Sequence, residues 1–450
     1  MLLCSLPKIY DKRHSVEPHP PTSFQLQSMT KHLKYILICL LALSTHTAGA
    51  QNDSVFVVHD SELDTDAVIG IPESMMADID SLLMLWNSKQ YMFPLPSNET
   101  ATYLTALTDS DFQERLNRIP AIVEMPYNNI VRQFIDQYTG KNNKTISFCL
   151  GAGNFYIPMF EEALAYYDLP FEFKYLPIIE SSLNPMARSK AGAVGLWQFM
   201  LATGKRYGLE VNSFVDERQD PVKSTWAAAR YLKDLYDIYH DWSLVIAAYN
   251  YGPGNINKAI HRAGGEADYW KIYPFLPTET RGYVPAFIAV NYAMQYYCDH
   301  HITPMQTQYP IATDTVIIDK MLHFQQIADL CNIHIDALRA LNPQYKKDII
   351  PGNVKPYALR LPQETLLTFI DLEDSVYLHR SDELLKRRTR IEIPNEVATP
   401  SGAKPKTIRV RKGENLGSIA AKYKTTVAKL RKLNGLKNNN IRAGQKLRIR

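Results

Sequence analysis

The sequence lacks the motifs that identify metal centres, disulfide frameworks and nucleotide-binding folds. Only five cysteines occur in 450 residues, and Cys149, Cys298 and Cys331 are far apart and odd in number. They predict no disulfide framework, and we expect each to be a small buried apolar side chain. Paired Cys motifs, an HExxH sequence and a glycine-rich phosphate loop are missing. We therefore expect no metal and no other cofactor.

One short segment, Cys298-Asp299-His300-His301, has the composition of a metal cluster. It ends a predicted helix, however, where cationic side chains interact favourably with the helix dipole. We therefore interpret it as a helix end, with a metal site as the weaker alternative.

Long hydrophobic runs are also scarce. The run from Tyr35 to Leu43 follows the basic residues Lys31 and Lys34 and precedes Ala48-Gly49-Ala50. It is too short to span a bilayer and predicts a secretory signal peptide over residues 29–50, with residues 1–28 upstream of the true start. The alternative is an amphipathic or buried helix. We expect the chain to be exported to the periplasm or cell envelope. The mature form should have no transmembrane segment, and it could still associate with the envelope surface.

Charge is distributed unevenly along the chain. From Lys404 onward, fifteen Lys and Arg oppose one acid, Glu414, which gives +14 against +4 for the whole chain and about −10 for the remainder. Such a segment binds polyanions. Export removes the chain from nucleic acid, so an anionic envelope polymer is the preferred partner, and a solvated basic face is the alternative.

The most informative stretch is Glu180 to Met200, ESSLNPMARSKAGAVGLWQFM. A single carboxylate follows an apolar run, Tyr175 to Ile179, and precedes a turn and a loop rich in small residues. Apolar surroundings disfavour the ionised form of a carboxyl group, so Glu180 could hold a proton near neutral pH and donate it to a leaving oxygen. Taken alone, a glutamate at a helix end is more often a solvated cap.

This stretch resembles the signature of the lytic transglycosylase family, which runs E-S-x-x-N-P-x-A-x-S and then G-A-x-G-L-x-Q-x-M. One departure is Leu201, where the family usually has proline after the methionine. The matching residues are Glu180, Ser181, Asn184, Pro185, Ala187, Ser189, Gly192, Ala193, Gly195, Leu196, Gln198 and Met200.

Two further segments resemble the same family. Residues Ala248 to Gly254 match A-Y-N-x-G-x-G, and Glu279 to Val284 match a third segment in which Tyr283 would line the cleft. Without the first motif, Tyr249 would more often be a core residue. We expect Pro285 in the first turn of the third segment's helix. The resemblance covers residues 120–298 and implies that the glycan is bound by Ser189, Gln198, Met200, Tyr249, Asn250 and Tyr283.

The resemblance implies a goose-lysozyme-like fold and cleavage of peptidoglycan glycan strands. Glu180 would protonate the oxygen between N-acetylmuramic acid and N-acetylglucosamine and then act as base on the muramoyl 6-hydroxyl, which yields a 1,6-anhydro end. Since the nucleophile belongs to the substrate, no second carboxylate is needed, unlike in most glycosidases. Two alternatives are a lysozyme-type hydrolase on the same fold and a non-catalytic wall-binding scaffold.

The C-terminal part contains an internal repeat. A shift of 92 residues aligns Ile327 with Ile419, Leu338 with Leu430 and Asn342 with Asn434. The second copy resembles the LysM domain, a βααβ module that binds N-acetylglucosamine polymers. The resemblance places its glycan groove in the loops 413–418 and 442–445, and the residues expected to bind are Gly413, Glu414, Asn415, Leu416, Arg442 and Gly444. The first copy is degenerate, and we predict its fold but not sugar binding.

The chain is thus predicted to be an α+β multidomain protein, because 450 residues exceed a single hydrophobic core. A mainly α-helical, lysozyme-like catalytic domain would precede two small βααβ modules. Helices are expected over residues 72–89, 114–119, 128–138, 156–167, 222–239, 242–251 and 255–262. The expected segments are 51–119, a loose leader to about 71 followed by a helical extension; 120–305, the catalytic domain; 314–363, the degenerate module; 364–405, a linker; and 406–450, the LysM domain.

Overall fold

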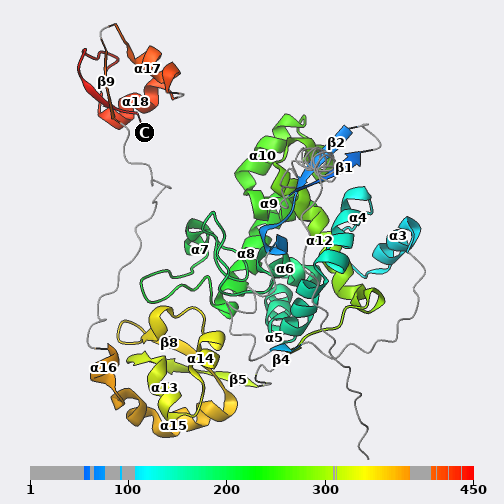
Figure 1. Ribbon diagram of the computed structural model, residues 1–450, viewed down its shortest axis with the longest axis vertical. Coiled ribbons are helices and arrows are strands. Elements are labelled where there is room, and N and C mark those ends of the chain that lie inside the picture. Colours follow the sequence, from blue (N-terminus) through cyan, green and yellow to red (C-terminus); the bar gives the residue numbers. More distant parts are fainter. Residues whose placement is uncertain are drawn as a thin grey trace, which may run out of the picture. The chain divides into compact units, whose positions relative to one another are not determined.

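The computed structural model describes residues 55–60, 65–76, 92–93, 107–307, 310, 312–385 and, except for residues 412, 424 and 437, 407–449 (Figure 1). The predicted signal peptide lies outside these residues. The described residues form three hydrophobic cores: a large one from residues within 58–305 with Ala340, a second from residues within 318–376 with Phe214 and Val215, and a third from residues within 410–449. The expected arrangement, a mainly helical domain followed by small C-terminal modules of strands and helices, is confirmed.

The helical domain buries its largest side chains around a short central helix. Among the described residues no helix is both long and apolar enough to cross a membrane. The elements are β1 (Val55–Asp60), β2 (Thr65–Gly70), β3 (Met92–Phe93), α3 (Asp109–Arg118), α4 (Asn129–Asp136), α5 (Asn143–Tyr166), α6 (Leu176–Ser181), α7 (Leu201–Arg206), α8 (Pro221–Tyr239), α9 (Trp242–Tyr251), α10 (Pro253–Arg262), α11 (Tyr269–Ile272), α12 (Thr278–Tyr296) and β4 (Gln306–Thr307).

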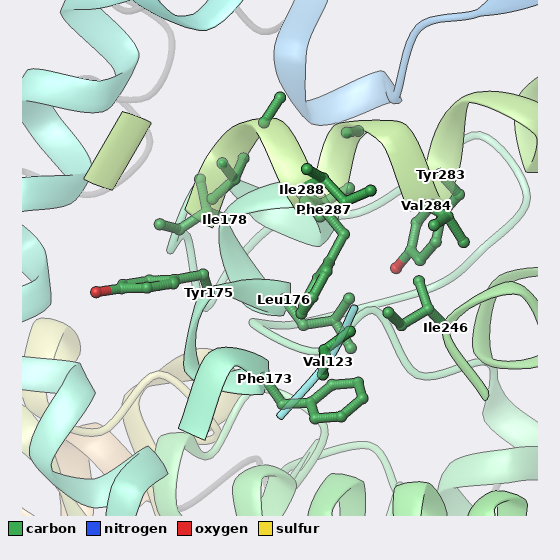
Figure 2. Packing of buried hydrophobic residues seen from close by; sticks show 14 of the residues in the cluster. Val123, Phe173, Tyr175, Leu176, Ile178, Ile246, Tyr283, Val284, Phe287 and Ile288 are labelled. Carbon is green, nitrogen blue, oxygen red and sulfur yellow. The ribbon is translucent and has the colours of Figure 1, made fainter. Parts of the chain in front are cut away.

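Helix α6 is the buried centre of this domain. Leu176 and Ile178 are almost fully buried and pack with residues of α12 and α9, including Phe287 and Ile246 (Figure 2). The rings of Phe173 and Phe287 lie 5.5 Å apart. A helix of only six residues has little stability of its own. Its position is therefore fixed by the long helix α12 beneath it.

Local signals explain where the neighbouring helices begin. The side chain of Asp220 accepts hydrogen bonds from the N–H groups of Val222 and Lys223, and Pro221 takes the first helical position of α8. Asp241 caps α9 in the same way. The predictions of helices at 222–239 and 242–251 are confirmed.

The expectation that residues 51–71 form a loose leader is wrong for the described residues. Strands β1 and β2 form an antiparallel hairpin in which Val55 pairs with Gly70 and Asp60 with Thr65. Ile69 is fully buried, and Phe56 packs edge-on against Phe134 at 4.8 Å. The acidic residues of this segment obscured two short β-branched runs, which bury one face against α12 and α4.

Pro285 lies in the interior of α12 and not in its first turn, because the helix already begins at Thr278. Proline has no N–H, so the carbonyl of Arg281, four residues earlier, loses its helical partner. The hydroxyl of Tyr269 donates to that carbonyl at 2.7 Å. The helix thus tolerates Pro285 because a neighbouring side chain satisfies the freed acceptor.

Three other expectations are corrected or fall partly outside the described residues. Of the helix predicted at 72–89, the described part is a 3₁₀ turn over Glu73–Met76. Helix α5 begins at Asn143, well before the predicted start at residue 156. Cys149 and Cys331 are buried as predicted, whereas Cys298 is exposed because it lies on the outer face of the 3₁₀ turn after α12.

The two copies of the repeat have the predicted βααβ order. Their first helices begin at residues 324 and 416 and their second helices at 335 and 427, in each case 92 apart. The outer strands pair antiparallel in both copies, β5 with β8 and β9 with β10. The elements are β5 (Thr313–Ile318), β6 (Met321–His323), α13 (Phe324–Leu330), α14 (Ile335–Leu341), β7 (Ile349–Pro351), β8 (Tyr357–Pro362), β9 (Thr407–Arg409), α17 (Leu416–Lys422), α18 (Val427–Asn434) and β10 (Lys446–Arg448).

The expected linker at 364–405 is wrong for its first part. Residues 363–385 form helices α15 (Gln363–Leu378) and α16 (Ser381–Leu385). Phe369 and Val376 of α15 are fully buried in the core of the first module. The Pro- and Gly-containing stretch at 394–405, which suggested a linker, lies outside the described residues.

Candidate active site

Glu180 is the penultimate residue of α6, where the buried helix reaches the surface of the domain. The chain then reverses through Ser182 and Leu183, whose φ angles of 50° and 59° are left-handed. Glu180 itself is only partly buried, so part of its side chain remains accessible. An acid that must meet a substrate while avoiding bulk water requires this combination.

Two tyrosines from different helices lie near this carboxyl group. The hydroxyl of Tyr283, from α12, donates a hydrogen bond to Oε1 of Glu180. Tyr249, at the end of α9, donates to the carbonyl of Trp197 at 2.8 Å. Burial raises the pKa of its hydroxyl well above the ordinary value, and the charge of Glu180 adds to this rise. Glu180, Tyr249 and Tyr283 are thus brought together from three helices.

Burial raises the pKa of Glu180 to about 7, and the hydrogen bond from Tyr283 opposes this rise. The desolvation of the charged form is the larger effect. Burial also raises the pKa of Tyr283 well above its ordinary value, so this hydroxyl remains a proton-bearing donor. At neutral pH Glu180 can therefore both donate and accept a proton.

The loop from Asn184 to Met200 is fixed to α6 and to itself. Ser181 Oγ lies 2.9 Å from the carbonyl oxygen of Leu196 and donates to it. Gln198, with a left-handed φ of 46°, directs its amide nitrogen to the carbonyls of Gly195 and Ala187 at 2.8 and 3.3 Å. Ser189 Oγ accepts from the N–H of Ala193 at 3.0 Å. Gln198 and Ser189 therefore shape the loop in this ligand-free structure.

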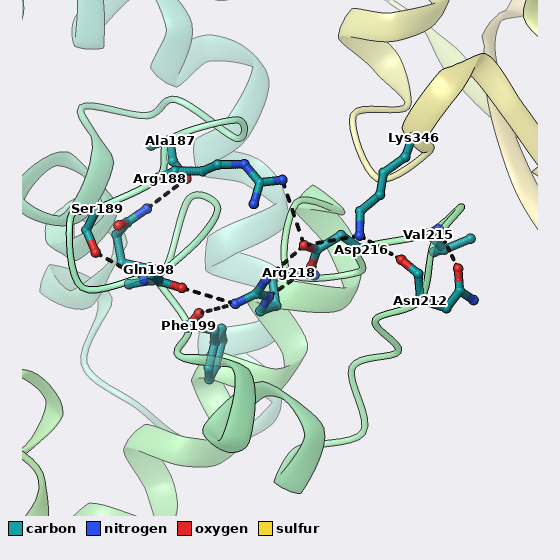
Figure 3. Close-up of polar contacts among 12 residues, drawn as sticks. Ala187, Arg188, Ser189, Gln198, Phe199, Asn212, Val215, Asp216, Arg218 and Lys346 are labelled. Atoms are coloured by element: carbon teal, nitrogen blue, oxygen red, sulfur yellow. Dashed lines mark hydrogen bonds and ion pairs between the residues drawn. The ribbon is translucent and has the colours of Figure 1, made fainter. Parts of the chain in front are cut away.

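A buried ion pair supports the same loop from behind (Figure 3). Arg218 binds Asp216 through two hydrogen bonds of 2.9 Å and also donates to the carbonyl of Phe199 at 3.2 Å. Gly195, at φ +90°, lies so close to this segment that a Cβ atom would approach the Arg218 carbonyl oxygen to 1.8 Å. Only glycine fits at this position.

The remaining predicted site residues lie at the edge of this group. Met200 is exposed at the start of α7. The amide oxygen of Asn250 accepts a hydrogen bond from Thr280 at 2.9 Å, which joins α9 to α12. Asn250 is therefore engaged with the scaffold in this structure.

Several residues around the site had no signal in the sequence. Ser74 donates to the carbonyl of Ile179 and its own carbonyl accepts from Ser182 at 3.2 Å, so the N-terminal hairpin segment supports the helix that carries Glu180. The ring of Tyr231 packs against that of Tyr249 in a tilted arrangement, with the ring centres 5.2 Å apart. A single serine or tyrosine outside any motif cannot be distinguished from its neighbours by sequence pattern alone.

The segment considered as a metal cluster is engaged in other contacts. Asp299 pairs with Arg115 at 3.0 Å, and the ring of His300 lies 3.0 Å from the hydroxyl of Tyr292. Within the described part of the chain, no three acidic, histidine or cysteine side chains are grouped as metal ligands.

The LysM loops of the second copy are open to solvent. Gly413 and Gly444 are exposed with left-handed φ angles, and a Cβ atom on either would meet nothing within 4 Å. Arg442 is exposed, Asn415 caps α17, and Glu414 accepts from the N–H of Arg411 at 2.9 Å. Leu416, by contrast, is buried in the module core. Leu416 therefore packs in the core of the module and does not line the groove as predicted.

In the first copy the corresponding loops are closed by the chain itself. Residues 321–323 and 349–351 pair as strands β6 and β7. The amide nitrogen of Gln326 donates to three main-chain carbonyls between Val376 and His379, at 2.8 to 3.2 Å. The end of α15 thus covers the segment that would form one side of a sugar groove.

Comparison with known proteins agrees with this geometry. Residues 157–272 match the transglycosylase SLT domain, 312–378 the LysM-like domain of lytic transglycosylase MltD, and 408–450 the LysM domain. All predicted cleft residues except Tyr283 fall within the first of these matches.

The chain is similar to proteins that contain such domains. It is 30% identical over 286 residues to membrane-bound lytic murein transglycosylase D of Escherichia coli K12, which covers 63% of this chain and 60% of that protein. It is 30% identical over 124 residues to the soluble lytic murein transglycosylase of the same strain, covering 26% and 19%.

Among solved structures, the 70 kDa soluble lytic transglycosylase of Escherichia coli aligns at 27% identity and a TM-score of 0.28, over 32% of this chain and 24% of that one. The chain thus contains a transglycosylase SLT domain, a LysM-like domain of the MltD type and a LysM domain, and it spans about 60% of the length of the lytic murein transglycosylase D that it matches.

Proposed function

We propose that this protein is a peptidoglycan lytic transglycosylase that cleaves the β-1,4 bond between N-acetylmuramic acid and N-acetylglucosamine. The observation that carries the proposal is the single carboxyl group of Glu180, whose pKa burial raises to about 7 and which Tyr283 holds by one oxygen. The other carboxyl oxygen is left to exchange a proton with the substrate.

One carboxyl group is sufficient for this reaction. A retaining glycosidase places a second carboxylate about 5 Å from the acid. The pKa of Glu180 reflects burial and Tyr283, with no contribution from another carboxylate of the described residues. An attacking group supplied by the substrate itself removes the need for a second carboxylate.

The proposed reaction has two proton transfers through the same side chain. Glu180 donates its proton to the glycosidic oxygen as the bond to C1 of the muramoyl residue breaks. The resulting carboxylate accepts the proton of the muramoyl 6-hydroxyl while that oxygen bonds to C1, which restores the acid and leaves a 1,6-anhydro ring. Because nucleophile and electrophile belong to one sugar, their proximity lowers the barrier.

We propose that Ser189, Gln198, Met200, Tyr249, Asn250 and Tyr283 bind and orient the glycan. Tyr283 has the best supported role, because it touches the reacting carboxyl group. Gln198 and Ser189 would present the loop that they shape, and the exposed side chain of Met200 would supply apolar contact.

Mass spectrometry of digested peptidoglycan tests this function. The wild-type protein should release fragments with 1,6-anhydro ends, and the nearly isosteric variant Glu180→Gln should release none while retaining its circular dichroism spectrum. Fragments with reducing ends would indicate a lysozyme-type hydrolase, and no new ends in the wild type would indicate a non-catalytic scaffold. Retained cleavage by Glu180→Gln would refute the role of this residue.

We further propose that the protein is exported and located in the cell envelope. There the second module would retain the enzyme on the cell wall. Two features support this: the open loops around Gly413 and Gly444, and the charge of +14 from Lys404 onward, which favours anionic envelope polymer. Peptidoglycan strands are the proposed partner, and nucleic acid is not.

A further inference from the structure

A pocket of about 320 Å³ lies where the first module meets the helical domain. Met186, Arg188 and Gln219 line it from the helical domain, and Tyr345, Lys346 and Lys347 line it from the loop after α14. This loop is distinct from the covered sugar groove of the same module. The pocket is large enough for part of a peptide.

Main-chain hydrogen bonds hold the two walls of the pocket together. The N–H of Lys346 donates to the carbonyl of Phe214 at 2.6 Å, and the N–H of Asp216 donates to the carbonyl of Gln344 at 2.9 Å. Phe214 and Val215 belong to the hydrophobic core of the module although they follow α7 in the chain. The two walls therefore form a fixed surface in this structure.

The residues that line the pocket carry an excess of positive charge. Arg339 and Asp348 line it as a two-bond ion pair, at 2.9 and 2.7 Å, and neutralise each other. Three further cations line it, Arg188, Lys346 and Lys347. They face one nearby acid, Asp216, which Arg218 binds at 2.9 Å and with which Arg188 and Lys346 form longer ion pairs.

The distances and the protonation behaviour agree with this excess. Arg188 and Lys346 lie 4.0 and 3.8 Å from Asp216, beyond hydrogen-bond distance. Burial lowers the pKa of Lys346, and Arg188, Arg218 and Lys347 lower it further against the opposing effect of Asp216. An anion in the pocket would relieve this repulsion.

We propose that this junction pocket binds a carboxylate of the peptide stem of peptidoglycan. Arg and Lys side chains recognise carboxylates through charge-assisted hydrogen bonds. Arg188 is adjacent in sequence to Ser189, and the amide of Gln198 bonds to the carbonyl of Ala187, so one loop borders both the proposed cleft and the pocket. The stem branches from the muramoyl sugar that reacts, so a bound strand would present its carboxylates beside this loop. The assignment rests on the proposed function.

Binding can be measured without turnover. The full chain carrying Glu180→Gln should bind a free stem tetrapeptide in calorimetry. Adding Arg188→Gln and Lys347→Asn should weaken binding about tenfold, since each removes one charged donor. Asparagine is chosen because Lys347 has a left-handed φ of 61°.

Matched variants define the specificity of this result. Lys144→Gln with Arg262→Gln removes the same charge from exposed positions elsewhere and should leave peptide binding unchanged. Arg188→Lys should retain most of it. Equal binding of a peptide with amidated carboxyl groups, or equal weakening by the control pair, would overturn the assignment.

Turnover of two substrates separates this inference from the proposed function. With Glu180 intact, Arg188→Gln with Lys347→Asn should lower kcat/KM for stem-bearing strands relative to amidase-stripped strands by about tenfold, mainly through KM. An equal loss on both substrates would show a structural role and refute the pocket. Absence of anhydro products from the wild type would refute the function instead, while the peptide-binding measurement still tests the pocket.

Discussion

The carboxyl group of Glu180 lies where its charged form is poorly solvated, and among the described residues one hydrogen bond, from Tyr283, compensates for this. Its folded-state pKa, about 7, exceeds the ordinary 4.5. The same environment that prepares the group for proton transfer must therefore cost folding free energy wherever the group is ionised.

The activity should depend on pH through this group. The acid form is needed for the first step, so turnover should fall as pH rises through about 7. Tyr283→Phe removes the hydrogen bond that lowers the pKa of Glu180, so the alkaline limb of kcat/KM should move to higher pH, with a lower maximum. A pH-rate series on soluble glycan fragments measures both. An unchanged limb in Tyr283→Phe would contradict the contact.

Glu180→Gln should stabilise the helical domain at alkaline pH. Between pH 4.5 and 7 the native state of the wild type holds a proton that the unfolded chain releases, so its stability falls as pH rises through this window. The variant lacks this penalty and should gain ~3 kcal/mol relative to wild type between pH 4 and pH 8. Urea unfolding followed by tryptophan fluorescence at both pH values measures the difference. A pH-independent difference would show that Glu180 is not desolvated.

That Glu180 lies near Tyr249 and Tyr283 could be predicted from sequence, because the family motifs that contain these residues have many fixed positions. The contacts of Ser74 and Arg218 could not. Ser74 donates to the carbonyl of Ile179 and Arg218 to that of Phe199, both distant in sequence. Which side chain bonds to a given main-chain carbonyl depends on the fold and not on residue type.

At the scale of elements, the loop from Asn184 to Met200 depends on close approach to the segment at 216–219. Arg218 donates to the loop carbonyls of Gly192 and Phe199 at 3.3 and 3.2 Å, and Gly195 contacts the Arg218 main chain. The loop is therefore held as a second wall opposite the helices that carry the tyrosines.

Gly195→Ala should disrupt this loop, and Gly192→Ala provides the control. Both glycines have φ angles near +90°, but a Cβ at Gly195 would lie 1.8 Å from the Arg218 oxygen, whereas at Gly192 it meets nothing within 4 Å. We expect a loss of about 1 kcal/mol for Gly192→Ala and about 3 kcal/mol or more for Gly195→Ala. Thermal unfolding of the two variants compares them. Equal losses of stability in the two variants would show that backbone strain, and not the clash with Arg218, causes the loss at Gly195.

The sequence predicted the helices of the large domain at 222–239 and 242–251, which correspond to α8 and α9. The same reasoning failed for the hairpin at 55–70 and for α15. Both are short amphipathic segments whose apolar faces are recognisable only once the surface that they cover is known.

At the scale of the molecule, the second module has a core made from its own residues. A chain that ends after residue 406 should therefore keep the unfolding temperature of the remaining cores and the turnover of soluble glycan fragments. It should lose co-sedimentation with insoluble cell walls, and the binding of the full chain should weaken with added salt because of its basic residues. Undiminished co-sedimentation of the shortened chain would contradict the proposed retention role.

The repeat itself was visible from the 92-residue shift, and the sequence also indicated that the first copy had diverged. The packing of the first copy against the helical domain could not be predicted from the sequence. Phe214 and Val215 look like ordinary residues of the helical domain, yet they pack in the core of the first copy. Such exchange of core residues between neighbouring units leaves no local pattern.

The covered groove of the first copy means that the two copies of the repeat differ in how accessible their loops are. Since the end of α15 covers the segment around Gln326, we expect sugar to bind the second copy and not the first, so that the pair would not bind bivalently. If the second copy binds the wall as proposed, it alone would set how long the protein stays on its polymer, and the first copy would serve as a fixed support of the helical domain. Relatives with more LysM copies should gain residence time only from those whose grooves remain vacant.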